Sequence, residues 1–421
     1  MELKCCILVI FVFLVTSTRS QDCPSACTCT DGQKTMICRG LTSLPEAVDD
    51  HFTEFIFDNC NLQGEFPKMP VSYSHAHTLQ IIHSNVESIA DGAFEDMREL
   101  VMLSLRGNKI QVINSAKLFG LSSLLTIDLQ GNQLTVIEDE LFRHNPILNK
   151  VIFSDNPFTK INDRAFAQPE NTDNPGPGSQ IQYIELENCN LNTIPTAALC
   201  INSVLPNLVS LDLSHNDFSH LEEDLFEHTA EIEQLELDSC KIQKITKGTL
   251  AGLTKLKSLR LSNNILSAID EESFADFFTS LNYIHLDYNK LTVVPYGLFN
   301  WAVVKVLNIS NNPWECSCSN GWIQEYNVTP NDTNYNITCG SPEMYKGKNA
   351  LQVMKYEIEP CAAPGSGPDP MIALYIAIPI IIILSIVTIF IIVKICILKK
   401  KDSHGRSAQY SLVYKPTTEK V

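Results

Sequence analysis

The chain has 421 residues, a formal charge of −17 at pH 7 and 15 cysteines. Residues 1–20 carry +1, residues 394–421 carry +5 and residues 371–393 carry none, which leaves −23 for residues 21–370. A segment this acidic disfavours nucleic acid as a partner and favours basic proteins or cations.

Residues 1–20 predict a secretory signal peptide. Lys4 precedes a short apolar run, and the small residues Thr18 and Ser20 occupy the cleavage positions before Gln21. The apolar run is too short to span a bilayer, which disfavours an N-terminal membrane anchor. Secretion would place the following segments in an oxidising compartment, where cysteines form disulfides.

Residues 21–51 predict a small cysteine-rich cap. Cys23, Cys27, Cys29 and Cys38 lie within 16 residues. Disulfides can hold together a segment that is too small to build its own core. A metal site is disfavoured because four thiolates would compete with oxidation, and the spacing alone allows three disulfide pairings.

Residues 52–312 contain a repeated pattern, seen most clearly in the segment 256–266, which reads L-x-x-L-x-L-x-x-N-x-L. Units of this pattern start at 52, 76, 100, 124, 148, 181, 208, 232, 256, 281 and 304, and the first five starts are 24 residues apart. One unit cannot bury its own apolar face, so the units must stack. The pattern predicts an α/β solenoid of about 11 leucine-rich repeats, a curved horseshoe with a parallel sheet on its concave face.

Several residues interrupt the repeat or take unusual positions in it. Cys60, Cys189 and Cys240 replace the asparagine at the ninth position, where buried structural thiols are expected. Cys200 has no such position and is either free or paired with another odd thiol.

The Pro- and Gly-rich insertion 168–180 predicts an exposed loop on the convex side. Three histidines at 75, 77 and 83 have uneven spacing and no fourth ligand, so we interpret them as surface residues rather than a metal site.

Residues 313–361 predict a second cap, which opens on Pro313-Trp314-Glu315-Cys316-Ser317-Cys318 and continues with Trp322, Cys339 and Cys361. The two caps and the repeats resemble the extracellular leucine-rich-repeat proteins, which include Slit, the Nogo receptor, the lamprey variable lymphocyte receptors and the Toll-like receptors. The resemblance implies four disulfides: Cys23–Cys29, Cys27–Cys38, Cys316–Cys339 and Cys318–Cys361.

The C-terminal part predicts a membrane anchor. Residues 362–370 form a Pro- and Gly-containing linker, and residues 371–393 are an uncharged apolar stretch long enough for one transmembrane helix. Lys394 and Lys399 to Lys401 follow it, so the tail 394–421 is expected in the cytoplasm of a single-pass type I plasma-membrane protein. The tail is too short for a signalling domain. It carries a clathrin-adaptor motif at Tyr410 and Val413 and a palmitoylation candidate at Cys396.

The predicted binding surface is the concave face, at repeat positions 2, 3, 5, 7 and 8, because side chains there project from a rigid sheet. Its middle is acidic and has tyrosines on or near it, a combination that suits a protein interface. The ligand-binding candidates are Glu185, Glu187, Asp212, Glu233, Glu236, Asp238, Tyr183, Tyr283 and Tyr288. The N-glycosylation candidates are Asn308, Asn327, Asn331 and Asn336, each of which begins an N-x-S/T sequence.

The sequence therefore predicts a cell-surface receptor or adhesion molecule that binds an extracellular or cell-surface protein, with homotypic contact as one form. An innate-immune or decoy receptor without a signalling domain and a non-catalytic tethering subunit are the alternatives. We expect no enzymatic activity and no cofactor, because the sequence has no phosphate-binding loop and no catalytic constellation. The adjacent residues Ser214, His215 and Asp217 cannot form a triad.

Overall fold

The structure is a computed structural model that describes residues 23–30, 32, 34–167, 179–199, 205–227, 229–324, 337–359, 383–384 and 386–395. The chain divides into two compact units, Met1–Glu359 and Pro360–Val421. Several predictions lie outside the described residues: the signal peptide, most of the insertion and of the apolar stretch 371–393, the linker, Cys200, Cys361, Asn327, Asn331, Asn336 and the tail features Cys396, Tyr410 and Val413.

A single sheet of 13 strands runs along the first unit, in the order β1-β2-β3-β5-β7-β8-β10-β12-β13-β14-β16-β18-β19. β1 is antiparallel to β2, and every later neighbour in this sheet is parallel. The bounds of these strands are β1 (Cys27–Thr30), β2 (Thr35–Arg39), β3 (Glu54–Asp58), β5 (Thr78–Ile82), β7 (Met102–Ser104), β8 (Thr126–Asp128), β10 (Lys150–Ile152), β12 (Tyr183–Glu185), β13 (Ser210–Asp212), β14 (Gln234–Glu236), β16 (Ser258–Arg260), β18 (Tyr283–His285) and β19 (Val306–Asn308).

The remaining elements of this unit are short. They are β4 (Gly64–Phe66), β6 (Val86–Ile89), β9 (Val136–Ile137), β11 (Lys160–Ile161), β15 (Lys244–Ile245), β17 (Ala268–Ile269), β20 (Trp314–Glu315), β21 (Cys339–Ser341), the helices α1 (Thr196–Leu199) and α2 (Ala350–Tyr356), and the 3-10 helices η2 (Val71–Tyr73), η4 (Ala275–Phe277), η5 (Tyr296–Leu298) and η6 (Cys318–Gln324).

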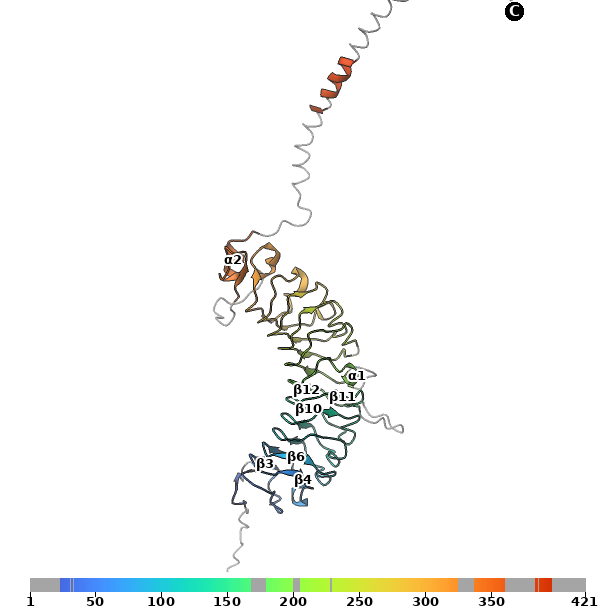
Figure 1. Cartoon of the computed structure of the whole chain (residues 1–421), viewed down its shortest axis with the longest axis vertical. Coiled ribbons are helices and arrows are strands. Elements are labelled where there is room, and N and C mark those ends of the chain that lie inside the picture. Colours follow the sequence, from blue (N-terminus) through green and yellow to red (C-terminus); the bar gives the residue numbers. More distant parts are fainter. Residues whose placement is uncertain are drawn as a thin grey trace, which may run out of the picture. The chain divides into compact units, whose positions relative to one another are not determined.

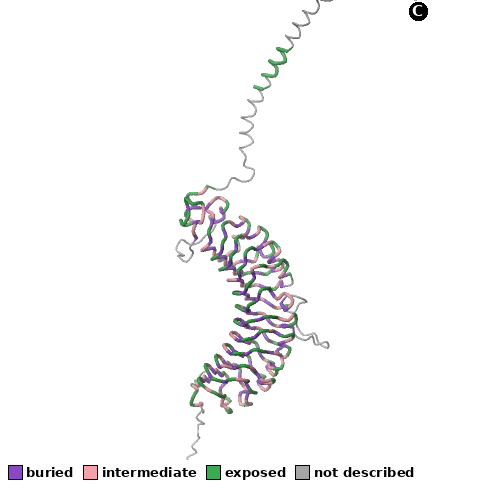
Figure 2. Tube along the Cα trace, viewed as in Figure 1, coloured by how far each residue is buried: buried purple, intermediate pink, exposed green. Residues whose placement is uncertain are grey.

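Each predicted repeat contributes one strand to the long sheet, so the predicted solenoid of about 11 repeats is confirmed. In Figure 1, β3, β10 and β12 lie on the concave side of the curved stack, and β11 and α1 lie on the opposite side. The repeated leucines point inward: Leu235 and Leu259 are in register on neighbouring strands, and both are fully buried. Figure 2 shows buried residues in every coil of the stack, and these residues form one hydrophobic core.

The ninth residue of each repeat ties one coil to the next. The Asn216 side chain donates hydrogen bonds to the carbonyls of Leu186 (2.8 Å) and Leu213 (2.8 Å), and its Oδ1 accepts from the backbone N–H groups of Cys189 and Leu191 (both 3.0 Å). The same pattern recurs at the other ninth-position asparagines. These side chains satisfy buried backbone groups that the curved stack leaves unpaired.

The ninth-position cysteines are buried free thiols, as predicted for Cys60, Cys189 and Cys240. The Cys189 thiol lies 3.3 Å from the Phe153 carbonyl, and the Cys240 thiol lies 3.3 Å from the Leu213 carbonyl. The thiol therefore takes over one of the hydrogen bonds that the asparagine makes in the other coils.

We expect Cys189 and Cys240 to resist alkylation in the native chain at neutral pH. Burial raises the pKa of both thiols to about 12, and the thiolate is the reactive form. Iodoacetamide followed by peptide mass spectrometry should modify both cysteines only after unfolding in urea. Modification of either one in the native chain would contradict the buried placement.

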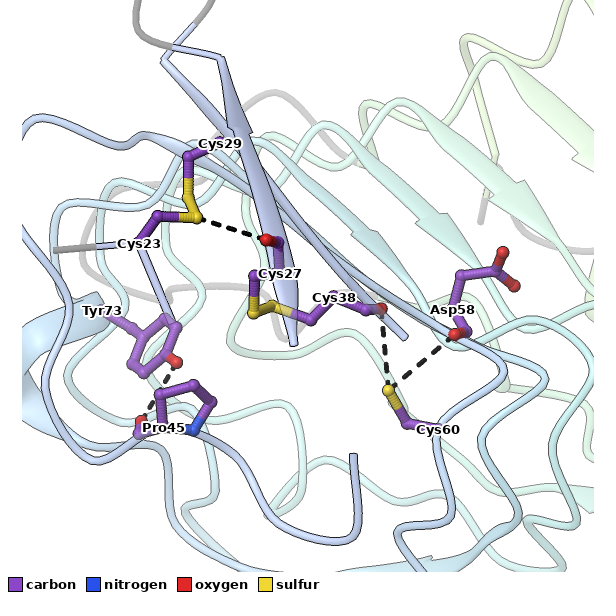
Figure 3. Close-up of a disulfide and its surroundings, with 8 residues drawn as sticks. All are labelled: Cys23, Cys27, Cys29, Cys38, Pro45, Asp58, Cys60 and Tyr73. Carbon is purple, nitrogen blue, oxygen red and sulfur yellow. Dashed lines mark hydrogen bonds between the residues drawn. A yellow bond between two sulfur atoms is a disulfide. The ribbon is translucent and has the colours of Figure 1, made fainter. Parts of the chain in front are cut away.

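The N-terminal cap closes the first end of the sheet. Disulfides join Cys23 to Cys29 and Cys27 to Cys38, as the family resemblance implied. Figure 3 shows both disulfides beside the first repeat, where the Cys60 thiol lies 3.7 Å from the Cys38 carbonyl. The Tyr73 hydroxyl donates to the Pro45 carbonyl at 3.1 Å, which connects the end of the first repeat to the cap. The cap thus covers an apolar coil face that would otherwise meet water.

The second cap is built on two buried tryptophans, Trp314 and Trp322, which pack edge to face with ring centroids 5.6 Å apart. Cys316 is bonded to Cys339, as predicted. Cys318 is also disulfide-bonded. Its predicted partner, Cys361, is outside the described residues.

The second unit contributes helical residues at 383–384 and 386–395, all of them exposed. Within these described residues, no helix combines the length and the apolar character that crossing a membrane requires.

Candidate functional site

Three acidic side chains from neighbouring strands lie next to one another on the concave face. Glu185 of β12, Asp212 of β13 and Glu236 of β14 occupy the fifth repeat position and are in register. Glu187 follows at the seventh position of the same coil as Glu185. We call these four residues the acidic centre. The repeat register brings them together from three coils, as the sequence predicted.

Basic residues of neighbouring coils pair with the outer members of this surface. Lys150 pairs with Glu185 at 2.7 Å, and Arg260 pairs with Glu236 at 3.4 Å. The ion pairs are solvent-exposed, so each contributes at most about 1 kcal/mol to stability. They mainly compensate negative charge at the two ends of the acidic centre. The predicted candidate Glu233 is compensated in the same way by Lys257, at 2.6 Å.

Asp238, also predicted to contact a ligand, is a buried side chain that holds Arg260. Its carboxylate accepts from Arg260 Nη2 at 2.7 Å and from the Ser262 backbone N–H at 2.6 Å, and the residue is only 8% exposed. Position 7 is also buried in several other coils, as at Ser214, Ser262 and Asp287. In these coils the residue at position 7 therefore does not project from the sheet, because the strand has ended and the chain turns there.

Asp212 and Glu187 form the uncompensated part of the acidic centre. Neither forms an ion pair with a lysine or arginine among the described residues. Burial raises the pKa of the Glu187 carboxyl, and Asp212 raises it further, against the opposing effect of His215, whose Nε2 lies 3.7 Å away. Burial and then Asp212 also raise the pKa of Glu236. The fold thus holds negative charge here at an electrostatic cost.

Glu187→Gln is expected to raise the thermal unfolding midpoint at neutral pH. The folded-state pKa of Glu187 lies above its ordinary value of 4.5, so the folded chain binds more protons than the unfolded chain as pH rises from 4.5 through the raised pKa. The free energy of unfolding therefore falls over this pH range. Glutamine removes this loss, so the advantage should vanish well below pH 4.5, where the carboxyl is protonated in both states. The exposed Glu222 provides a Glu222→Gln control. An advantage for Glu187→Gln that is equal at both pH values would contradict the account.

A polar groove of about 740 Å³ lies beside the acidic centre, at the ends of the strands of four successive coils. One wall consists of eighth-position residues, the other of tenth-position residues, and two ninth-position asparagines lie between them. The lining residues are Asp155, Asn188, His215, Ser239, Pro157, Asn190, Asp217, Lys241, Asn156 and Asn216. Glu187 connects the two surfaces, because it precedes Asn188 in the chain and lies against His215.

Hydrogen bonds fix the groove's carboxylates. Asn188 Nδ2 and Gln130 Nε2 each donate to Asp155 at 2.8 Å, and these bonds hold the pKa of Asp155 below its ordinary value. Lys241 pairs with Asp217 on the far wall at 2.5 Å. The groove is therefore preorganised, with an anionic end at Asp155 next to Glu187 and a compensated end at Lys241.

This groove was not predicted from the sequence, because half of its lining comes from tenth-position residues, which lie outside the predicted binding surface. The missing signal lies at position 8, where all eleven residues have positive φ: Asn59, His83, Gly107, Gly131, Asp155, Asn188, His215, Ser239, Asn263, Tyr288 and Asn311. The left-handed conformation at each of them turns the chain, and in four successive coils the groove is lined by the residue at this turn and the residue two positions later.

The predicted tyrosines separate into two places. Tyr183 is 38% exposed on β12, in register with Lys150, so it borders the acidic centre. Tyr283 lies on β18, three strands beyond β13 in the sheet order, and Tyr288 follows it in the turn. Tyr288 is 56% exposed and has a φ of 55°, a conformation that costs about 1–2 kcal/mol in a residue with a Cβ. The repeat imposes this conformation, because position 8 has positive φ in every coil and the Tyr288 N–H donates to the Ser310 carbonyl of the next coil at 3.0 Å.

The comparisons with known proteins agree with this architecture. The leucine-rich-repeat family matches residues 74–134, 179–242 and 231–278. Leucine-rich repeat-containing protein 3 of Danio rerio is 32% identical over 130 residues, which are 30% of this chain and 48% of that protein. Trophoblast glycoprotein of Macaca fascicularis is 23% identical over 362 residues, which are 82% of this chain and 71% of that protein. The chain thus spans about half the length of the first of these relatives.

Among solved structures, a chain of the octameric complex of Latrophilin 3, Unc5D and FLRT2, in which FLRT2 supplies the leucine-rich repeats, superposes with a TM-score of 0.62. The two are 22% identical, and the match covers 78% of this chain and 97% of that one. At this identity, the likeness shows the fold. The repeats, the caps and these comparisons agree on a leucine-rich-repeat fold with a disulfide-bonded cap at each end.

Proposed function

We propose that this chain is a cell-surface receptor or adhesion molecule that binds another protein on its concave face, at the acidic centre and the adjoining polar groove. One observation carries the proposal: among the described residues, neither Glu187 nor Asp212 pairs with a lysine or arginine, and burial together with Asp212 raises the pKa of Glu187, so the Glu187 charge is unfavourable for the chain alone. A basic side chain of a partner would neutralise this negative charge and remove its electrostatic penalty. The penalty would therefore favour binding of a basic partner.

The geometry fits a protein ligand better than a small molecule. Strands about 4.8 Å apart place Glu185, Asp212 and Glu236 along roughly 10 Å of the concave face. The groove continues this surface at the strand ends, and Tyr183 supplies an exposed aromatic ring of the kind that protein interfaces favour. The relative FLRT2 forms a complex with Latrophilin 3 and Unc5D, which supports an interaction role for this fold.

The proposal places the acidic centre outside the cell. The signal peptide 1–20 and a span at 371–393 would make the chain a type I membrane protein, with the tail 394–421 in the cytoplasm. Ten residues between 383 and 395 are large, exposed hydrophobics, which is the surface a lipid-facing helix needs. In the tail, Tyr410 and Val413 would bind a clathrin adaptor, and Cys396 would carry a palmitoyl chain.

Epitope tags placed after residue 21 and after residue 421 test this topology. Antibody should stain the N-terminal tag on intact cells and the C-terminal tag only after permeabilisation. Deleting residues 371–393 should release the N-terminal tag into the medium. Retention of both tags inside intact cells would refute the surface location, whatever the chain binds.

A further inference from the structure

Asn308 is the one asparagine of the four N-x-S/T sequences that the structure describes, and it lies on the concave face. It is the last residue of β19, half-buried, with its side chain at the fifth repeat position. Its Oδ1 accepts hydrogen bonds from the Ser310 backbone N–H (3.2 Å) and the Ser310 hydroxyl (2.8 Å). Among the described residues, its Nδ2, the atom that would carry a glycan, donates no hydrogen bond.

The neighbouring asparagine Asn312 has a structural role, because its side chain bonds the backbone of its own coil and of the preceding coil. Its Nδ2 donates to the carbonyls of Leu286 and Ile309, at 2.9 and 3.2 Å, and the residue is only 3% exposed. Asn308 contributes no such tie between coils. Its amide nitrogen is therefore available for modification without loss of a structural hydrogen bond.

The surface next to Asn308 has the chemistry that packs against a sugar. His285 of β18 is directly in register with Asn308, and Tyr283 lies two residues earlier on the same face. Strand spacing puts the Cα atoms of Tyr283 and Asn308 roughly 8 Å apart. Tyr283 is 40% exposed, and the Lys305 amine lies 5.9 Å from the centroid of its ring. An aromatic ring can pack on the apolar face of a pyranose, and the amine and imidazole can bond its hydroxyls.

We propose that Asn308 carries an N-linked glycan whose first sugars pack on Tyr283 and His285 and close the C-terminal end of the concave face to protein ligands. This inference rests on the proposed passage of the chain through the secretory pathway. The glycan would lie beside the acidic centre rather than over it, because four strand spacings, about 19 Å, separate β13 from β19. Tyr283, predicted as a ligand contact, would instead support the glycan.

Tyr183 provides a matched control within the same chain. It occupies the same third repeat position as Tyr283 and is exposed to nearly the same extent, 38% against 40%. Neither β10 nor β13, the strands beside it, carries an N-x-S/T sequence. The two tyrosines should therefore react alike with a solvent probe unless a glycan covers one of them.

The test uses the full-length chain purified from animal cells. Peptide N-glycosidase converts a glycosylated asparagine into aspartate, so mass spectrometry reads modification separately at Asn308, Asn327, Asn331 and Asn336. Hydroxyl-radical footprinting then compares oxidation of Tyr283 and Tyr183 before and after glycan removal. We expect Asn308 to be glycosylated and Tyr283 to oxidise several-fold more slowly than Tyr183 until the glycan is removed. Asn308→Gln should abolish the difference without enzyme treatment.

Each other result overturns a defined part of the inference. Modification of the other sites with Asn308 unmodified refutes the glycan at Asn308 but leaves the surface location intact. Lack of modification at all four sites refutes the glycan and counts against passage through the secretory pathway. A glycosylated Asn308 with equal oxidation of Tyr283 and Tyr183 refutes the packing. If Asn308→Gln fails to fold, enzymatic removal from the native chain gives the same comparison.

Discussion

Replacing Asn216 by alanine is expected to lower the free energy of unfolding by about 4 kcal/mol, because it leaves buried backbone groups without partners. The N–H groups of Cys189 and Leu191 would lose their acceptor, and the Leu186 carbonyl would lose its donor. A domain is typically stable by only about 5–15 kcal/mol, so the variant should secrete poorly. The shift of the urea midpoint of residues 21–361 measures the effect.

Two further variants isolate the cause. Asn282→Ala removes an asparagine whose side chain makes no hydrogen bond among the described residues, so it should have little effect. Asn216→Cys should destabilise less than Asn216→Ala, because Cys189 and Cys240 already occupy the ninth position and bond a carbonyl there. Equal midpoints for Asn216→Ala and Asn282→Ala would show that the ladder of ninth-position asparagines does not hold the coils together.

Reversing the charge of Glu187 and Asp212 together is expected to abolish partner binding and leave folding intact. Lysine at both positions would repel the basic surface that the acidic centre is proposed to bind. The two residues are chosen because Lys150 and Arg260 already compensate Glu185 and Glu236, so reversing those would also disturb ion pairs within the chain. Neither Glu187 nor Asp212 has such a pair among the described residues, and the burial that raises the pKa of Glu187 would be relieved by its removal.

The matched control reverses two exposed glutamates outside the concave face. Glu222 and Glu271 lie in the second halves of their coils, and no ion pair is found for either among the described residues. Glu222→Lys with Glu271→Lys changes the net charge by the same amount, so it separates a local effect from a general loss of acidity. Loss of binding in both double variants would indicate that total charge, rather than the acidic centre, attracts the partner.

The repeat pattern was sufficient to predict most of the fold, because each coil repeats the same contacts. The positions of Leu259 and Leu261 determine which side of the strand faces the core, and the 24-residue spacing determines which residues are in register. The disulfides Cys23–Cys29 and Cys27–Cys38 followed from a family resemblance, since spacing alone left three pairings open. The burial of Asp238 could not be predicted, because it depends on where the strand ends rather than on the repeat.

The sequence predicted which acidic residues lie side by side in the candidate site. It did not predict which of them lack a basic partner. The register placed Glu185, Asp212 and Glu236 side by side. Which acid remains uncompensated depends on the reach of Lys150 and Arg260 from neighbouring coils, and side-chain conformations decide that. The groove depends on the left-handed turn at position 8, which the mixture of residue types at that position obscures.

A binding screen with residues 21–361 in multivalent form would show whether the acidic centre binds a partner. Three versions would be compared against arrayed secreted and cell-surface proteins, the chain itself included: the unaltered unit, Glu187→Lys with Asp212→Lys, and Glu222→Lys with Glu271→Lys. We expect a partner with a basic surface that binds the first and third versions and not the second. A membrane-bound partner would indicate adhesion, and a soluble one would indicate a receptor. A partner that binds all three versions equally would contradict the account and move the binding site away from the acidic centre.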